Sequence, residues 1–358
     1  MASINEELRS RAVSHAIYLE RYKSGVWARL AALLDRADND LIAELQKRAV
    51  SSEFTQYRLG LLLDAVREMS QETGVKFREQ LRAEMRAIGA YELEYQQRSL
   101  GATLPKAIAV DLGVVAPSVS LVYSAAFSQP FQGRLLREWG ASLEKAKLVK
   151  VQEAIRMGIV EGETAAQIVQ RIRGTRALRY KDGVLALARR QTEAIVRTAV
   201  NHTVTQAREQ LYAANPDLIK GWQFVATLDS RTTPECQSLD GRVFPIGEGP
   251  MPPRHVNCRS ATIPITKSYR ELGINRDELP PGSRASMNGQ VPATETYGSW
   301  IKKQSADVQN EALGKTRAQL MRAGGLTVDK FVDRKGHSYT LDQLRSREAA
   351  AFEKAGIE

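Results

Sequence analysis

The first hundred residues contain no proline, and that absence constrains the fold more than any other feature of the chain. Proline interrupts helices because it lacks an amide donor and clashes with the preceding turn, and the first one here is Pro105. Apolar side chains recur at three- and four-residue steps, which places them on one face of a helix. The clearest stripe is Leu59, Leu62, Leu63, Val66 and Met69. We therefore predict a long helical arm or a helical bundle over residues 1–100.

Residues 101–130 have a different character. Two short runs rich in β-branched side chains, at 108–115 and 119–123, lie on either side of Pro117. Such side chains favour an extended backbone. This segment is therefore predicted to be a linker or to contain short strands.

Helical spacing returns after residue 130. Thr164 is predicted to cap a helix, because Gln167 stands three residues later and completes a capping box. A long helix is expected from about Leu185 to Ala213, and the pair Asn215-Pro216 ends it.

Beyond Pro216 the pattern favours strands. The expected strands are 222–228, 241–245 and 261–265, and a loop rich in proline and glycine at 247–253 separates the last two. Residues 277–295 are predicted to be a linker, and 296–358 a small α/β tail with a helical piece at about 296–323. The fold class is therefore mainly α, with a long helical N-terminal arm or bundle and a small α+β C-terminal module.

The bulk composition narrows the class of protein. With two cysteines in 358 residues, a disulfide framework is excluded and a reducing compartment is expected. No apolar run approaches the ~20 residues that span a bilayer. Residues 1–7 are acidic and lack the apolar core of a signal peptide, so secretion is not expected.

Positive charge is concentrated in one helical segment. The chain carries a net charge of +10, and residues 131–213 hold fifteen Lys/Arg against eight Asp/Glu. An excess of this kind attracts phosphate backbones through counterion release. The residues assigned to nucleic-acid binding are Arg171, Arg173, Arg176, Arg179, Lys181, Arg189 and Arg190. A solvated helix face is the alternative, because no nucleic-acid-reading motif accompanies the charge.

Both cysteines and one of the four histidines lie in a single turn-rich segment. The spacing is Cys-x18-His-x2-Cys, from Cys236 through His255 to Cys258. Thiolates and an imidazole suit tetrahedral Zn²⁺, so we predict a structural zinc site at these three residues. The candidates for a fourth ligand are Asp229, Asp240 and His202, with Asp229 preferred.

Other interpretations of this segment stay open. The cysteines could be reduced side chains packed beneath the loop, or they could form a disulfide, which a reducing compartment disfavours. A catalytic cysteine paired with His255 is a further alternative, although no nucleophile elbow and no phosphate-binding loop is recognisable. Asp229 is also well placed for an Asx turn that caps backbone amides. The chain is predicted not to be an enzyme.

Taken in order, these motifs resemble the phage Mu F-like minor head proteins, the phage head morphogenesis family. The matching pieces are Gly158, Gly162-Glu163-Thr164, Arg197-Thr198-Ala199-Val200-Asn201, Trp222, Asp229-x-Arg231-Thr232, Cys236, Leu239-x-Gly241 and Pro253-x-His255-x-Asn257-Cys258-Arg259. They cover about 131–265, and the last piece is the most specific. Residues 297–345 resemble the tail of many members, whereas the first hundred residues match only loosely.

The resemblance implies a head morphogenesis domain at 131–276 and a virion structural protein that acts in head assembly and DNA packaging. It places the protein in the head interior or at the portal vertex, after assembly in the host cytoplasm, in several copies per virion. The implied partners are the portal protein, capsid or scaffold proteins and packaged double-stranded DNA bound without sequence specificity, with no membrane in the assembled head. Two alternatives are a DNA-binding protein ejected with the genome and a zinc- or cysteine-dependent enzyme.

Overall fold

A computed structural model describes residues 4–48, 56–104, 113–273, 275 and 283–357. The chain divides into two compact units. Unit 1 comprises Met1–Leu19, Ala90–Val122 and Val204–Glu358, and unit 2 comprises Glu20–Gly89 and Tyr123–Thr203. The predicted class, mainly α with long N-terminal helices and small antiparallel sheets in the C-terminal part, is confirmed.

Long helices account for most of the first 213 residues. They are α1 (Ile4–Arg48), α2 (Gln56–Thr103), α4 (Val119–Ser128), α5 (Leu136–Val160), α6 (Ala165–Arg173) and α7 (Val184–Ala213). The prediction of long helices over the proline-free segment is confirmed by α1 and α2. In the described part of the chain, no helix combines the length and apolar character needed to cross a membrane.

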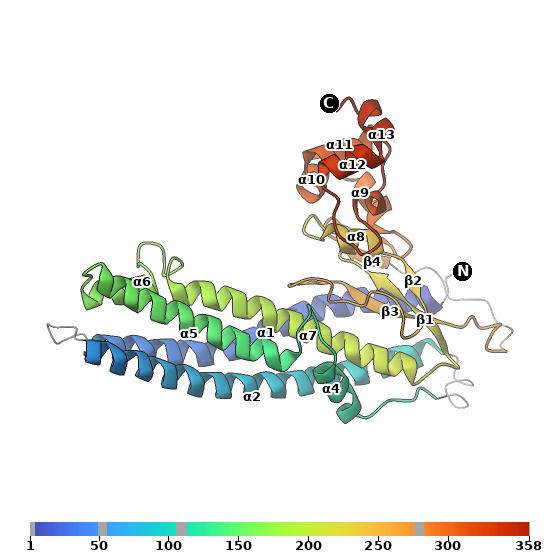
Figure 1. Ribbon diagram of the computed structural model, residues 1–358. Coiled ribbons are helices and arrows are strands. Elements are labelled where there is room, and N and C mark those ends of the chain that lie inside the picture. The colour runs from blue at the N-terminus through green and yellow to red at the C-terminus, as the bar shows by residue number, and fades with distance from the viewer. Residues whose placement is uncertain (1–3, 49–55, 105–112, 274, 276–282, 358) are drawn as a thin grey trace. The chain divides into compact units, whose positions relative to one another are not determined.

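Unit 2 is a helical bundle in which parts of α1, α2, α5 and α7 run side by side (Figure 1). These four helices and α6 contribute apolar residues to one core: Leu41, Ile42, Leu45, Leu62, Leu63, Val66, Val151, Ala154, Ile155, Ile168, Val169, Ile172 and Leu185. Three members of the predicted stripe, Leu62, Leu63 and Val66, are among them. The predicted capping box of α6 is also present, since the Thr164 hydroxyl accepts from the Gln167 amide. The part of residues 1–100 that lies in this unit therefore forms a bundle with the basic segment.

Unit 1 contains the predicted strands in a three-stranded antiparallel sheet of order β2-β1-β3. The strands are β1 (Ile219–Val225), β2 (Val243–Phe244) and β3 (Ala261–Thr266). Trp222 on β1 is fully buried, stacks on Phe244 at 4.8 Å and donates its indole N–H to the Glu248 carbonyl. The sheet core thereby holds the start of the Pro/Gly loop.

A buried charged group lies between helices and sheet within unit 1. The carboxylate of Glu92 on α2 accepts from the guanidinium of Arg208 on α7, at 2.6 Å, and lies 2.6 Å from Nε2 of His15 on α1. Arg208 also donates to the Thr262 carbonyl on β3 at 2.9 Å. Since Glu92 and Arg208 are both fully buried, each depends on the other for a counter-charge.

The prediction of a linker or short strand at 119–123 is wrong, because these residues begin helix α4. Ser118 follows Pro117, and its hydroxyl accepts from the Leu121 amide, as an N-cap side chain does. Val122 and Ala126, four residues apart, are both buried, which is helical spacing. Local capping therefore outweighs β propensity. Most of the other predicted strand, at 108–115, lies outside the described residues, and its described end at 113–115 is irregular.

The predicted linker at 277–295 is also corrected. Residues 276–282 lie outside the description, but β4 (Ser283–Ser286) and β5 (Gly289–Pro292) form a hairpin. The two-residue turn Met287-Asn288 connects the strands. Gly289, which begins β5, has a positive φ of 110° that glycine tolerates.

The tail is helical rather than α/β in the part described. Its elements are α9 (Tyr297–Lys302), α10 (Ala306–Leu313), α11 (Lys315–Arg322), η1 (Val328–Phe331), α12 (Leu341–Arg347) and α13 (Ala349–Lys354). The single helical piece expected over 296–323 is three helices. Gly314 lies between α10 and α11 and has a φ of 79°. It separates the two helices, because a residue with positive φ cannot continue a right-handed helix.

Candidate metal centre

Cys236 lies on a short helix, α8 (Pro234–Leu239), that follows the β1 strand. Pro234 occupies the first helical position, where its missing amide proton costs nothing. The Cys236 side chain is 1% exposed and packs in the same core as Trp222 and Leu239. The first thiol is therefore held by the core of unit 1 and not by a mobile loop.

His255 and Cys258 are the first and last residues of one tight turn. The Cys258 amide donates to the His255 carbonyl at 3.1 Å. Asn257 adopts a φ of 61°, a left-handed conformation that asparagine tolerates better than most residues. The motif His-x-Asn-Cys thus encodes a turn that brings an imidazole and a thiol together.

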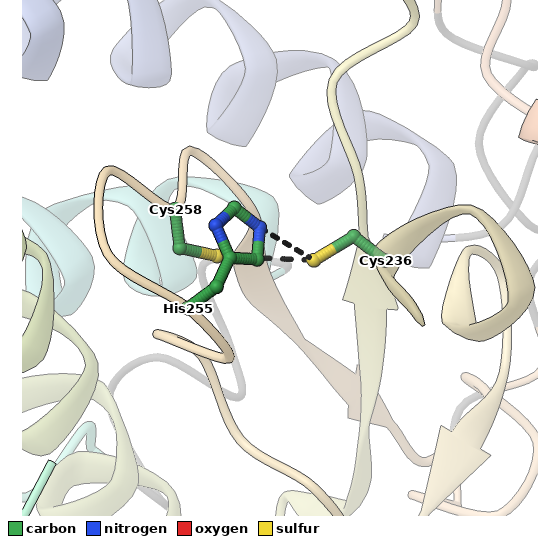
Figure 2. Close-up of side chains that lie close together, drawn as sticks. All are labelled: Cys236, His255 and Cys258. Atoms are coloured by element: carbon green, nitrogen blue, oxygen red, sulfur yellow. Dashed lines mark hydrogen bonds between the residues drawn. The ribbon is translucent and has the colours of Figure 1, made fainter. Parts of the chain in front are cut away.

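The three side chains converge (Figure 2). The Cys236 Sγ atom lies 3.4 Å from His255 Nε2 and 3.9 Å from Cys258 Sγ, and all three donor atoms are within 4.8 Å of one another. A tetrahedral zinc ion, with Zn–S of about 2.3 Å and Zn–N of about 2.0 Å, separates two sulfurs by about 3.8 Å and a sulfur from a nitrogen by about 3.5 Å. The two distances to Cys236 therefore match those around one tetrahedral metal ion.

The orientation of His255 also suits a ligand. Its Nδ1 atom lies 2.9 Å from the Val256 carbonyl oxygen. Because a carbonyl only accepts, Nδ1 carries a proton, and Nε2 is the ring nitrogen that can bind a metal. Metal-binding histidines are held by this kind of second hydrogen bond.

Without a metal, the pKa values of the two thiols are shifted in opposite directions. Hydrogen bonding from Cys236, together with His255, lowers the pKa of Cys258 despite its burial. The hydrogen bond with Cys258, and then burial, raises the pKa of Cys236. Of the two thiols, Cys258 therefore loses its proton more readily and Cys236 holds its proton more tightly.

The preferred fourth ligand, Asp229, lies outside the group of three donors. Its carboxylate accepts from Arg259 at 2.8 Å, from the Thr232 hydroxyl at 3.1 Å and from the Arg231 amide at 3.1 Å. The last contact is the predicted Asx turn. Burial alone would raise the pKa of Asp229, but the hydrogen bonds and charge of Arg259 lower it. This carboxylate fixes the turn after β1 and pairs with the arginine that follows Cys258.

The other two candidates for a fourth ligand are engaged elsewhere. Asp240 accepts from the Ala226 amide at 2.6 Å, from the Tyr297 amide at 2.6 Å and from Arg284 at 3.0 Å. His202 belongs to unit 2, where its Nε2 atom lies 3.0 Å from the Ala126 carbonyl oxygen. Among the described residues, the group of donors that could hold a metal is Cys236, His255 and Cys258.

Sequence reasoning missed Arg284, which lies in the segment predicted to be a linker. Its side chain is 2% exposed and donates to Asp240 and to the Glu295 carbonyl. This ion pair ties the β4–β5 hairpin and the start of α9 to the residues that follow α8. The Asn-Gly pair at the hairpin turn was the available signal, because a hairpin would have placed Arg284 in a strand.

The residues predicted to bind nucleic acid lie in unit 2 and fall into two groups. Arg171 pairs with Glu161 and Glu163, and Arg189 pairs with Asp35 and Asp38. The others are exposed at or beside the 174–183 loop: Arg173, Arg176, Arg179, Lys181 and Arg190. Ion pairs thus neutralise Arg171 and Arg189, and the other five predicted residues lie at or beside the 174–183 loop.

The family model described as Phage Mu protein F like protein matches residues 149–263. Neither the curated proteins nor the solved structures contain a significant match to the chain. The resemblance found in the sequence is confirmed over the matched segment, which includes α7, β1, α8, β2 and the start of β3. Over residues 149–263, which hold all three donors of the candidate metal centre, the chain is therefore similar to the Phage Mu F family.

Proposed function

We propose that this protein is a structural component of a phage head, acting in head morphogenesis. The support is the family match over 149–263, a segment that contains both the metal centre and the long helix α7. The implied partners are the portal protein, capsid or scaffold proteins and packaged DNA. The implied location is the head interior or the portal vertex.

Within that role, the Cys236, His255 and Cys258 side chains bind a structural Zn²⁺. The observation that carries this part is the convergence of two thiols and a correctly oriented imidazole at distances that suit one ion. Zinc requires deprotonated thiols, and Cys258 already has a lowered pKa. The ion would join α8 to the His255–Cys258 turn across the end of the sheet.

Burial favours a structural role over turnover. The Cys236 and Cys258 side chains are each 1% exposed, whereas reactive cysteines occupy partly exposed sites. The nearby polar groups are also committed to the fold: Asp229 to Arg259, and Asp240 to Arg284. An enzyme is therefore the less supported alternative.

Mass spectrometry of purified particles tests the head assignment. The phage is induced from a host that carries this gene, and DNA-filled heads are separated from soluble protein. We expect peptides of this chain in the heads at a constant ratio to the portal protein, and heads that fail to assemble or to retain DNA when the gene is deleted. Normal, infectious heads that lack the chain would contradict the proposal.

A further inference from the structure

Ion pairing within unit 2 neutralises several of the cations in its basic segment, but not those between α6 and α7. Besides Arg171 and Arg189, Arg197 pairs with Glu20 at 2.8 Å and Lys147 pairs with Asp38. By contrast, the structure gives Arg176, Arg179 and Lys181 no acidic partner among the described residues. All three belong to the segment 174–183 between α6 and α7, called the basic loop below.

The two ends of the basic loop are pinned together by glycines. A Cβ atom on Gly183 would meet the Arg173 carbonyl carbon at 2.3 Å and the Gly174 nitrogen at 2.4 Å, so only glycine permits this approach. Gly174 itself has a φ of 98°. The Asp182 carboxylate closes the loop further by accepting from the Thr175 amide at 2.9 Å.

Backbone hydrogen bonds fix the interior of the loop. The Tyr180 amide donates to the Thr175 carbonyl at 2.8 Å, and the Arg179 amide donates to the Arg176 carbonyl at 3.0 Å. Arg179 and Tyr180 both adopt left-handed φ angles, 52° and 60°. Two such residues in succession cost about 1–2 kcal/mol each, and strain of this kind persists where the surroundings impose it and is concentrated at functional sites.

Most exposed side chains of the loop are cationic or apolar, and one, Asp182, is acidic. Arg173, at the end of α6, lies over the Tyr180 ring at 4.6 Å, and Arg190 on α7 donates to the Lys181 carbonyl. The acid in the loop, Asp182, is occupied by the Thr175 amide. Leu178 is 58% exposed, although burying it would favour folding by about 2 kcal/mol.

We propose that the basic loop binds the phosphate backbone of double-stranded DNA. A duplex carries one charge per about 1.7 Å of its axis, so several cations on one small rigid loop can contact it together. Rigidity lowers the entropy cost of binding. Leu178 offers an apolar contact of the type that minor-groove proteins place between base steps, flanked by Arg and Lys. The choice of double-stranded DNA as ligand rests on the proposed head function, whereas the choice of loop rests on the charges.

A salt titration of DNA binding tests the proposal. Full-length protein is titrated into a labelled duplex of mixed sequence at several salt concentrations, and fluorescence anisotropy gives the slope of log K against log salt. The test variant is Arg176→Gln/Arg179→Gln/Lys181→Gln, which removes three charges and keeps an unbranched polar side chain at the left-handed Arg179. Since each phosphate contact contributes about 0.9 to the slope, we expect its magnitude to fall by about 3.

A control variant with the same change in net charge distinguishes direct phosphate contacts of the basic loop from a general effect of charge. Arg67→Gln/Lys76→Gln/Arg98→Gln removes three exposed cations that are already paired with acids on their own helices. We expect it to keep the wild-type slope. Wild-type protein that shows no salt-dependent DNA binding, or loop and control variants with the same slope, would overturn the proposal. Retained zinc and particle incorporation in that case would leave the proposed function intact.

Discussion

Units 1 and 2 are stabilised in different ways. Unit 2 buries a continuous set of aliphatic side chains from five helices, and its ion pairs are mostly at the surface, as for Arg189 with Asp35 at 34% and 50% exposure. Unit 1 has an apolar core as well, but it also buries complete ion pairs. Asp240 with Arg284 and Glu92 with Arg208 are each at most 2% exposed.

This difference affects how each unit tolerates change. An aliphatic bundle is held by many interchangeable contacts, so the loss of one exposed ion pair costs little. A buried charge has no interchangeable partner, because taking it out of water costs several kcal/mol that its counter-ion offsets. Unit 1 should therefore be the more easily broken by a single polar substitution, and unit 2 the more tolerant.

The largest effect is expected from Arg284→Leu in unit 1. Removing the guanidinium leaves Asp240 buried without its counter-charge, so unit 1 should lose about 3–5 kcal/mol of unfolding free energy. Urea unfolding followed by tryptophan fluorescence measures it. Because unit 1 contains Trp222 and Trp300, a Trp27→Phe/Trp139→Phe background reports unit 1 alone. A loss below about 1 kcal/mol would contradict the buried-pair account.

Acid should destabilise the two units in different pH ranges. Burial lowers the pKa of His202 in unit 2 to about 4, from an ordinary 6.5. The unfolded chain therefore binds this proton at a higher pH than the folded one, and stability present above pH 6.5 is lost as the pH falls towards 4, by about 3 kcal/mol. His202→Gln should remove that loss.

In unit 1 the corresponding group is Glu92. Burial raises its pKa, but the charge of Arg208 and the hydrogen bond from His15 outweigh this and lower it to about 2. Its contribution is present above the unfolded value of 4.5 and is lost as the pH falls towards 2. Urea midpoints of the two units, measured from pH 7 to 3, should therefore fall first for unit 2. Urea midpoints that fall over the same pH range in both units would contradict this expectation.

A smaller effect is expected for the cap of α6. Thr164→Ala removes the hydroxyl that accepts from the Gln167 amide, which should cost about 1 kcal/mol of unit 2 stability. Thr164→Ser retains the acceptor and should cost much less. Equal losses for alanine and serine in urea unfolding would show that the methyl group, and not the cap, matters.

The smallest effect is expected for an exposed ion pair. Lys76 and Glu72 are 62% and 69% exposed and one helical turn apart. Lys76→Ala should change the stability of unit 2 by less than about 0.5 kcal/mol. A loss comparable to that of Arg284→Leu would contradict the contrast between the units.

The same contrast explains what the sequence could predict. Helical periodicity depends on spacing within one segment, so the stripe through Leu62 and Val66 identified α2 and the capping box identified the start of α6. The strands of the sheet were also recognisable from β-branched runs between turns. Helix α4 was mistaken for a strand, since the cap at Ser118 outweighs the propensity of Val119 and Val122.

The candidate metal centre was partly predictable, because Cys236, His255 and Cys258 are rare residue types in one segment. The role of Asp229 was not, since its choice between a metal ligand and a partner of Arg259 depends on the path of the chain between them. The pairing of Asp240 with Arg284 joins residues 44 apart in sequence. Nothing local distinguishes such an arginine from a solvated one.

The metal content of the full-length protein tests the central claim most directly. Protein purified from zinc-supplemented medium is analysed by elemental mass spectrometry, beside Cys258→Ser and a serine variant of a partly exposed residue in unit 2, Thr175→Ser. We predict one zinc per chain in the wild type and in Thr175→Ser, none in Cys258→Ser, and a thiolate-to-cobalt charge-transfer absorption when Co²⁺ replaces zinc. Wild-type protein that takes up neither metal while remaining folded would contradict the claim that these three side chains form a metal centre.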